Sequence, residues 1–269
     1  MLKLVATDMD GTLLTDNKEM PEKIFKIIDD LHKRGIAFAV ASGRQHFSLQ
    51  KLYGEIKDDI IIVAGNGSII IDKGEIISVD TLDFDVVYEI VEEISKMPSL
   101  KATICGLEAD YMFEDNVTST LSDHLVNSHF PVTSIIKSLD DLPEHEKILQ
   151  IAIYDPSHNS EKNIYDKLKH LGGKCHITVS GVEWVDIIAV GVNKGTAIKK
   201  LQQMLGATPE ETMVFGDESN DYEMMEQAYY SYAMANAIPK IKEIAKFRAP
   251  SNEDEGVVKI LENFLSMTK

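Results

Sequence analysis

Short apolar runs alternate along the first part of the chain with a stretch whose apolar positions recur every three or four residues. The stretch 20–34 follows this helical spacing, and Gly35 ends it. The runs 2–7, 36–41 and 60–64 are almost continuously apolar, which is typical of parallel strands that are covered on both faces. This alternation predicts the beginning of a doubly wound α/β domain.

The pattern changes near residue 83 and returns near residue 188. A turn at 72–74 between two apolar runs predicts a hairpin just before the change. The elements expected after it are helices around 87–94, 162–171 and 194–205, and strands at 101–105, 148–154, 175–179 and 212–215. We therefore predict a doubly wound, Rossmann-like parallel-sheet core of residues 1–82 and 188–269, interrupted by an inserted α+β domain of residues 83–187.

Composition and charge narrow the classes of protein. The 269 residues are 44% hydrophobic and 26% charged, the balance of an ordinary globular protein. The formal net charge of −17 argues against a general binder of nucleic acid or of anionic membranes, because both are polyanions. No apolar run approaches the roughly 20 residues of a membrane span, and the first residues lack a signal-peptide pattern, so we expect a cytoplasmic protein. Cys105 and Cys175 have no metal or redox spacing, and we expect them to be buried thiols.

Two carboxylates stand one residue apart directly after the first predicted strand. Asp8 and Asp10 have no Lys or Arg beside them in the sequence. A buried pair of like charges is costly unless a cation or a proton offsets it. The pair therefore predicts a bound metal, a shared proton, or both.

Further polar clusters follow other predicted strands or begin helices, where a doubly wound sheet brings them to one edge. Ser42 and the backbone N–H groups after it, beginning at Gly43, are suited to a phosphate, and Lys194 at a helix start can supply a positive charge. Each cluster alone is an ordinary turn or helix start. Their order and their convergence on one sheet edge indicate a site.

Carboxylates also gather at this predicted edge. The set that would surround a hard cation is Asp8, Asp10, Asp217 and Asp221. Oxygen ligands with room for water favour Mg²⁺.

Four short segments carry a family resemblance. DMDGTLL (8–14), ASGR (41–44), NKG (193–195) and GDESND (216–221) resemble the four motifs of the haloacid dehalogenase superfamily. The insertion between the second and third motifs resembles its Cof-like branch, subclass IIB, whose members are mostly phosphatases with an α/β cap. The resemblance covers essentially the whole chain.

The resemblance implies a role for each motif residue. Asp8 would be the nucleophile and Asp10 the general acid and base. The other implied roles are phosphoryl binding by Ser42, Gly43, Lys194 and Asn220, Mg²⁺ binding by Asp8, Asp217 and the main-chain carbonyl of Asp10, and support of the metal site by Asp221 without contact to the ion.

The chemistry explains the spacing of the aspartate pair. Asp8 must be ionised to attack phosphorus, whereas Asp10 must protonate the leaving oxygen and later take a proton from water. If the backbone turns at Asp10, the two side chains point in different directions. One carboxylate can then meet phosphorus while the other meets the leaving group.

We therefore predict a Mg²⁺-dependent phosphatase that acts on small phosphorylated metabolites, sugar phosphates first, through an aspartyl-phosphate. The alternatives are a phosphosugar mutase on the same core and a phospho-accepting signalling or binding protein. A receiver domain of the latter kind needs neither the acid/base at Asp10 nor an inserted domain. No feature of the sequence indicates an oligomeric state.

The inserted domain should decide the substrate. Candidate pocket residues in it are Tyr111, His124, His129, Tyr154, His158 and Trp184. Packing or surface positions are the commoner use of these residue types, and the eight His have no metal-ligand spacing.

Overall fold

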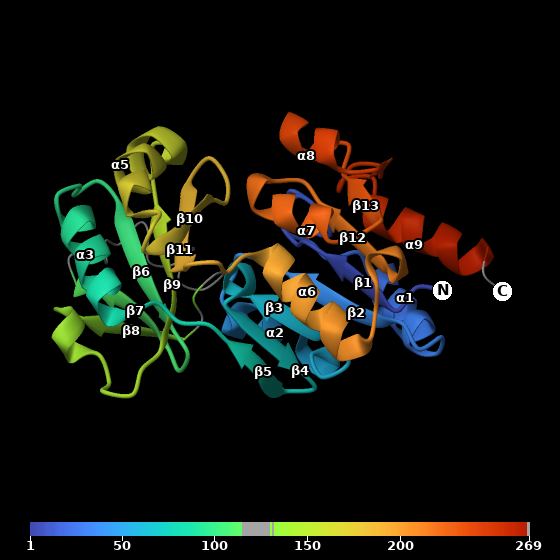
Figure 1. Ribbon diagram of the computed structural model, residues 1–269, viewed down its shortest axis with the longest axis horizontal. Coiled ribbons are helices and arrows are strands. Elements are labelled where there is room, and N and C mark those ends of the chain that lie inside the picture. The colour runs from blue at the N-terminus through green and yellow to red at the C-terminus, as the bar shows by residue number, and fades with distance from the viewer. Residues whose placement is uncertain (115–129, 131, 268–269) are drawn as a thin grey trace.

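The computed structural model of the chain describes residues 1–114, 130 and 132–267, and in this part the strands form two separate sheets (Figure 1). The first sheet has the order β14-β13-β12-β1-β2-β3-β4-β5. Its strands are β1 (Leu4–Thr7), β2 (Ala37–Ala41), β3 (Ile61–Ala64), β4 (Ile69–Asp72), β5 (Glu75–Val79), β12 (Thr212–Gly216), β13 (Tyr230–Ala233) and β14 (Phe247–Arg248). The strands from β14 to β3 run parallel, and β4 and β5 are added antiparallel.

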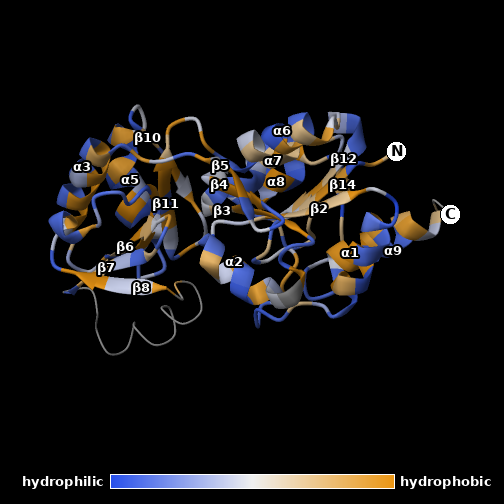
Figure 2. Ribbon diagram, turned by 90° about the horizontal axis from the view of Figure 1, so that it is seen from below, coloured by the Kyte–Doolittle hydropathy of each residue, from blue (hydrophilic) through white to orange (hydrophobic). Residues whose placement is uncertain are grey.

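Helices cover both faces of the first sheet. They are α1 (Lys23–His32), α2 (His46–Tyr53), α6 (Lys194–Leu205), α7 (Tyr222–Glu226), α8 (Pro239–Ile244) and α9 (Gly256–Met267). Figure 2 shows α6, α7 and α8 on one side of the sheet and α1, α2 and α9 on the other. All four residues of β1 are buried, as expected for a parallel strand between two helical layers.

The second sheet lies between β5 and α6 in the sequence and has the order β10-β11-β9-β6-β7-β8. Its strands are β6 (Lys101–Gly106), β7 (Asp110–Phe113), β8 (Thr133–Ile136), β9 (Ile148–Tyr154), β10 (Cys175–Val179) and β11 (Trp184–Ala189). They pair antiparallel except β7 with β8. We call this sheet and its helices the cap.

The helices of the cap pack on one face of its sheet. They are α3 (Phe84–Ser95), a π-helical segment (Glu161–Tyr165), α5 (Asp166–Leu168) and a 3₁₀ turn (Lys169–Leu171). Ile151, Ile153 and Ile187 point to these helices and belong to a hydrophobic cluster separate from that of the first sheet. Because side chains alternate along a strand, Gln150 and Asp186 lie on the opposite face.

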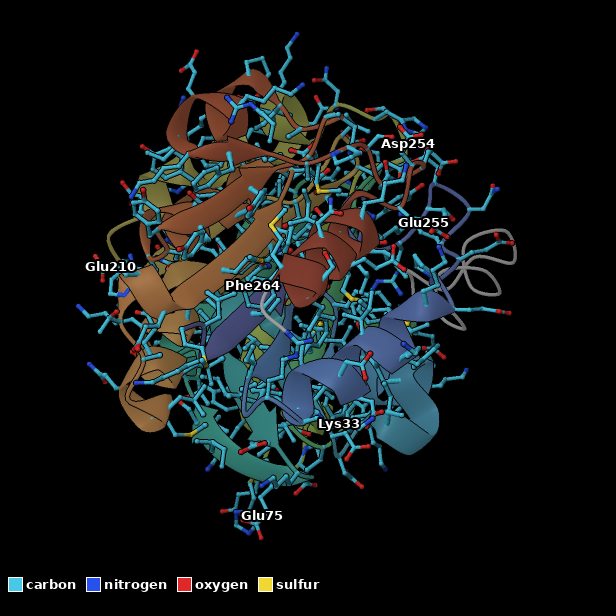
Figure 3. All side chains as sticks on the ribbon, turned by 90° about the vertical axis from the view of Figure 1, so that its right-hand side faces the viewer. Lys33, Glu75, Glu210, Asp254, Glu255 and Phe264 are labelled. Atoms are coloured by element: carbon cyan, nitrogen blue, oxygen red, sulfur yellow. The ribbon has the colours of Figure 1, made fainter. Side chains whose placement is uncertain are left out.

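Short 3₁₀ turns complete the described structure. They are Gly54–Ile56, Gly65–Gly67, Leu139–Asp141, Pro209–Glu211 and Ser219–Asp221. In the described residues no helix is both long and apolar enough to cross a membrane. Charged side chains such as Lys33, Glu75 and Glu210 project outward, in keeping with the strongly charged sequence (Figure 3).

The predicted fold class is confirmed, since a doubly wound core carries an inserted α+β domain. The hairpin at 72–74 is present between β4 and β5, and Lys73 and Gly74 both have positive φ, as a tight hairpin turn of this kind requires. Cys105 and Cys175 are buried free thiols. The division of the chain at residues 82/83 and 187/188 stays a prediction; β11 pairs within the cap sheet as far as Ala189.

Candidate active site

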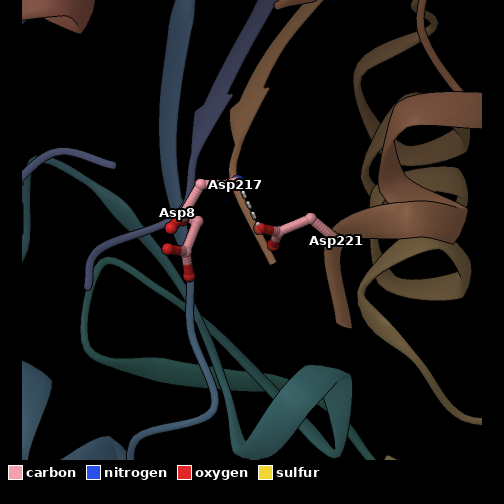
Figure 4. Close-up of side chains that lie close together, drawn as sticks. All are labelled: Asp8, Asp217 and Asp221. Atoms are coloured by element: carbon pink, nitrogen blue, oxygen red, sulfur yellow. Dashed lines mark hydrogen bonds between the residues drawn. The ribbon is translucent and has the colours of Figure 1, made fainter. Parts of the chain in front are cut away.

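Two aspartates follow the carboxyl ends of two adjacent parallel strands. β1 ends at Thr7 and β12 at Gly216, and the amide of Asp8 donates to the carbonyl of Phe215 over 3.0 Å. Asp8 and Asp217 therefore meet at one edge of the sheet (Figure 4). Thr12, in the turn after β1, donates to Oδ1 of Asp217 over 2.6 Å.

That turn depends on a glycine. Gly11 has a φ of +82°, and a Cβ there would overlap a carboxylate oxygen of Asp217. Glycine is the residue that adopts this conformation without strain and leaves the space empty. The turn therefore brings Asp217 against the backbone that carries Asp8 and Asp10.

Lys194 is the buried cation of this edge. It begins α6 and is wholly buried, and its Nζ lies 2.6 Å from Oδ1 of Asp8 and 2.7 Å from Oδ1 of Asp221. The other oxygen of Asp221 accepts from the amides of Asp217 and Glu218 at 2.9 and 3.1 Å. Burial lowers the pKa of Lys194, but the charges of Asp221 and Asp8 outweigh it and raise the pKa above its ordinary value. Lys194 is therefore charged and orients two carboxylates.

The single positive charge of Lys194 does not balance the negative charges of the carboxylates around it. Burial raises the pKa of Asp8 to about 7, with Lys194 opposing and Asp221 adding to the shift. Burial and the charges of Asp8 and Asp221 raise the pKa of Asp217 to about 8. Asp8, Asp217 and Asp221 each offer an oxygen within 4.8 Å of the others. This donor set fits a hard divalent cation, which would supply the missing positive charge.

Asp10 has different surroundings. Its carboxylate accepts from Nε and Nη2 of Arg44, both at 2.7 Å, and lies 2.8 Å from Nζ of Lys18. Burial acts to raise the pKa of Asp10, but the hydrogen bonds and charges of Arg44 and Lys18 outweigh it and hold the pKa well below its usual range. Although Asp8 and Asp10 are one residue apart, their pKa values are thus shifted in opposite directions.

Of the other predicted phosphoryl-binding residues, Ser42 and Gly43 follow β2, and Asn220 lies in the turn after β12. Ser42 is buried, and its Oγ accepts from the amide of Arg44 at 3.1 Å. The carbonyl of Gly43 accepts from Nε2 of Gln150 in the cap at 3.3 Å. Asn220 donates from Nδ2 to Oδ1 of Asn66 at 2.9 Å.

The structure brings Asp8, Asp217, Asp221 and Lys194 into one cluster of direct or near contacts. Ser42, Gly43 and Asn220 lie at neighbouring strand ends. Asn66 links Ser42 to Asn220, because its backbone N–H donates to the carbonyl of Ser42 at 2.9 Å and its Oδ1 accepts from Nδ2 of Asn220 at 2.9 Å.

The candidate pocket residues of the cap are spread out. Tyr111 is buried and donates to Glu146, and the rings of Tyr154 and Trp184 pack 4.9 Å apart. The exposed His158 lies 3.1 Å from Glu183. His124 and His129 lie outside the described residues. The described four are engaged in packing or surface contacts.

Some residues of the site were not assigned a role from the sequence. Thr12 and Arg44 lie within the DMDGTLL and ASGR segments, so their position in these motifs could have identified them as site residues. Gln150 and Asp186 interrupt the apolar runs of β9 and β11, and a polar residue in such a run is a signal of a buried polar contact.

Comparisons with known proteins agree with this geometry. The family model described as haloacid dehalogenase-like hydrolase matches residues 5–261. The chain is 30% identical over 268 residues to the 5-amino-6-(5-phospho-D-ribitylamino)uracil phosphatase YbjI of Escherichia coli K12, covering 98% of this chain and 96% of that protein.

Two solved structures have the same fold. The structure of SMU.1108c from Streptococcus mutans UA159 has a TM-score of 0.90 and 29% identity, and the match covers 99% of this chain and 100% of that one. A subclass IIB sugar phosphatase has a TM-score of 0.83 at 20% identity, with coverage of 97% and 98%, and this likeness concerns the fold alone.

Proposed function

Because the chain belongs to the haloacid dehalogenase-like hydrolases, as the four motifs predicted, we propose that it is a Mg²⁺-dependent phosphatase that forms an aspartyl-phosphate on Asp8. The observation that carries the proposal is the buried cluster in which Lys194 holds Asp8 beside Asp217 and Asp221. An ionised, oriented carboxylate next to a fixed cation is what nucleophilic attack on a phosphate ester requires.

The residues that would hold Mg²⁺ are Asp8, Asp217 and the main-chain carbonyl of Asp10. Both oxygens of Asp221 already accept hydrogen bonds, from Lys194 and from two backbone amides, so Asp221 would position Lys194 and the loop. When bound, Mg²⁺ supplies positive charge that keeps Asp8 ionised and offsets the charge of the phosphoryl oxygens.

The reaction has two displacements at phosphorus. In the first, an oxygen of Asp8 bonds to phosphorus while the bond to the leaving oxygen breaks, and Asp10 gives that oxygen a proton. In the second, Asp10 takes a proton from water, the water oxygen bonds to phosphorus, and the bond to Asp8 breaks. Lys194, Ser42, the amide of Gly43 and Asn220 would hold the phosphoryl oxygens.

Arg44 and Lys18 constrain the first displacement. Both hold Asp10 as a carboxylate, so Asp10 must lose at least part of this pairing before it can carry a proton. A bound phosphate ester offers oxygens that compete for the Arg44 guanidinium. We therefore expect substrate binding to draw Arg44 away from Asp10.

For the substrate we propose small phosphorylated metabolites, with sugar phosphates first. The relative YbjI is named for a substrate in which a phosphorylated ribityl group, a sugar-alcohol phosphate, is attached to an aminouracil. The test measures inorganic phosphate released from sugar phosphates, ribityl phosphates, nucleotides and phosphorylated cofactors, in Mg²⁺ and in EDTA.

The blank of this test is Asp8→Asn, and the matched control is Asp155→Asn. Asp155 is a buried cap aspartate whose carboxylate accepts from Ser157 and Asn163. We expect release that needs Mg²⁺, vanishes in Asp8→Asn and persists in Asp155→Asn. Appreciable turnover by Asp8→Asn would contradict the nucleophile, and isomerised phosphosugar in place of free phosphate would favour the mutase.

A further inference from the structure

Buried polar side chains form a continuous chain from the cap to the predicted phosphoryl site. Asp186 of β11 accepts from Nδ2 of Asn66 at 2.8 Å, and Oδ1 of Asn66 accepts from Nδ2 of Asn220 at 2.9 Å. Asp186 and Asn66 are 4% and 1% exposed, so water cannot replace either partner. The hydrogen bond between them joins residues 120 positions apart, one in strand β11 of the cap and one in the 3₁₀ turn Gly65–Gly67 of the core.

The direction of these hydrogen bonds follows from their first member. An ionised carboxylate only accepts, so Asn66 must turn its NH₂ group to Asp186 and its oxygen to Asn220. Asn220 must then use one N–H for Asn66, which leaves the other N–H of the same nitrogen for a ligand. Burial raises the pKa of Asp186 to about 6, while hydrogen bonds from Ser180, Asn66 and Gln150 and the charge of Lys194 lower it, so the carboxylate is ionised at neutral pH.

These hydrogen-bonded side chains lie directly beside the backbone that is predicted to bind the phosphoryl group. A Cβ at Gly43 would lie 3.1 Å from both the amide nitrogen of Asn66 and a carboxylate oxygen of Asp186. Asn66 itself has a φ of +53° between two glycines, a conformation that asparagine tolerates better than most residues. The backbone at this position therefore presents the Asn66 amide to Asp186 and Asn220 at once.

We propose that Asp186 is a positioning residue of the cap that, through Asn66, sets the orientation of the Asn220 amide toward the phosphoryl group. The proposal rests on the proposed function insofar as Asn220 contacts a phosphoryl group. It makes closure of the cap on the core part of the assembly of the site, because Asp186 belongs to the cap sheet and Asn220 to the core.

A purely structural role for Asp186 makes a different prediction. Asp186 also accepts from Gln150 at 2.7 Å and from Ser180, so its removal disturbs the cap as well. Truncation of Asp155 disturbs the cap in a comparable way without a connection to Asn220. Asp155→Ala is therefore the matched control for Asp186→Ala.

The experiment is a double-mutant cycle of Asp186→Ala and Asn220→Ala. The readouts are kcat and KM for p-nitrophenyl phosphate and the Kd of orthovanadate, an oxyanion analogue of phosphate, with Mg²⁺ present. Loss of one donor to a developing charge lowers kcat by roughly 10²-fold or more, and we expect that loss in Asn220→Ala. We expect Asp186→Ala to lower activity roughly 10-fold or more, mainly through kcat. In the Asn220→Ala background the same substitution should lower kcat less than about 2-fold.

A conservative variant sharpens the test. In Asp186→Asn the new amide oxygen can still accept from Asn66. Gln150 can turn its amide so that Oε1, which has no hydrogen-bond partner among the described residues, accepts from the new NH₂ group, and the only loss is the 3.3 Å hydrogen bond of Nε2 to the carbonyl of Gly43. We therefore expect Asp186→Asn to stay within about 3-fold of the wild-type kcat and Asp155→Ala to leave it unchanged.

Equal losses from Asp186→Ala in the two backgrounds would overturn the proposal, as would wild-type values in Asp186→Ala. If the wild type hydrolyses no phosphate ester, the proposed function fails. The role of Asp186 is then decided by the double-mutant cycle measured through the Kd of orthovanadate alone. A wild type that neither hydrolyses a phosphate ester nor binds vanadate would overturn both the proposed function and the role of Asp186.

Discussion

Replacement of Lys194 by methionine removes the cation from the site and keeps a side chain of similar length. Lys194 is wholly buried between Asp8 and Asp221, at 2.6 and 2.7 Å. Removal of one partner of a buried ion pair costs about 3–5 kcal/mol because it leaves an uncompensated buried charge. A domain's whole free energy of unfolding is about 5–15 kcal/mol, so Lys194→Met should be among the most damaging single changes in this chain.

The loss of stability in Lys194→Met should depend on pH and on bound metal. Without Lys194 the crowded carboxylates bind protons more tightly in the folded state than in the unfolded chain, so the free energy of unfolding falls as the pH rises. The variant should therefore be closest to the wild type near pH 5 and furthest from it near pH 8. Bound Mg²⁺ should recover part of the difference, because a ligand of the folded state stabilises it.

The assay is urea unfolding of the wild type and Lys194→Met at pH 5 and pH 8, in EDTA and in Mg²⁺. The matched control is Lys200→Met on the same helix, whose ion pair with Asp80 is at the surface and should contribute less than about 1 kcal/mol. Phosphate release by Lys194→Met should be severely depressed. A loss below about 1 kcal/mol at pH 8 in EDTA, or a loss equal to that of Lys200→Met, would refute the reasoning.

Two further predictions concern a buried carboxyl group of the cap and the glycine of the turn after β1. Burial raises the pKa of Asp110 from 3.8 to about 7, so between these values its carboxyl lowers the free energy of unfolding as the pH rises, by up to about 1.4 kcal/mol per pH unit for one proton. Asp110→Asn should thus gain stability relative to the wild type from pH 5 to pH 7 in urea unfolding, and parallel curves would contradict this. Gly11→Ala should lower phosphate release at least roughly 10-fold and weaken Mg²⁺ binding by calorimetry, because its Cβ displaces Asp217, whereas Gly35→Ala, at a positive φ with open space, should keep both near wild type.

Much of the fold could be predicted from local pattern. The helical spacing of 20–34 and the apolar runs at 36–41 and 60–64 correspond to α1, β2 and β3. A helix that is buried on one face has apolar residues at a period near 3.6, and a strand that is covered on both faces is a continuous apolar run. Strands β7, β8, β13 and β14 were not predicted. They are short, between two and four residues, and a run of that length carries little periodicity.

The proximity of Asp8, Asp217, Asp221 and Lys194 could be predicted from the sequence, because parallel strands place their carboxyl ends at one edge and the helix that leads into β12 begins there. The same reasoning placed Asp10 among the carboxylates around the cation, whereas the Asp10 carboxylate pairs with Arg44 and Lys18. The catalytic and metal-binding roles of the aspartates and Lys194 remain proposals for the experiments above.

Only the tertiary structure decided which side chains pair. Arg44 and Lys18 flank Asp10, and Asp186 reaches Asn66 from another sheet. These partners are far apart in sequence or lie on irregular turns, and the contact between Asp186 and Asn66 also depends on how the cap packs against the core. Hydrophobic periodicity reports whether a residue is buried, whereas the identity of its polar neighbour is set by the relative placement of elements, which no local pattern encodes.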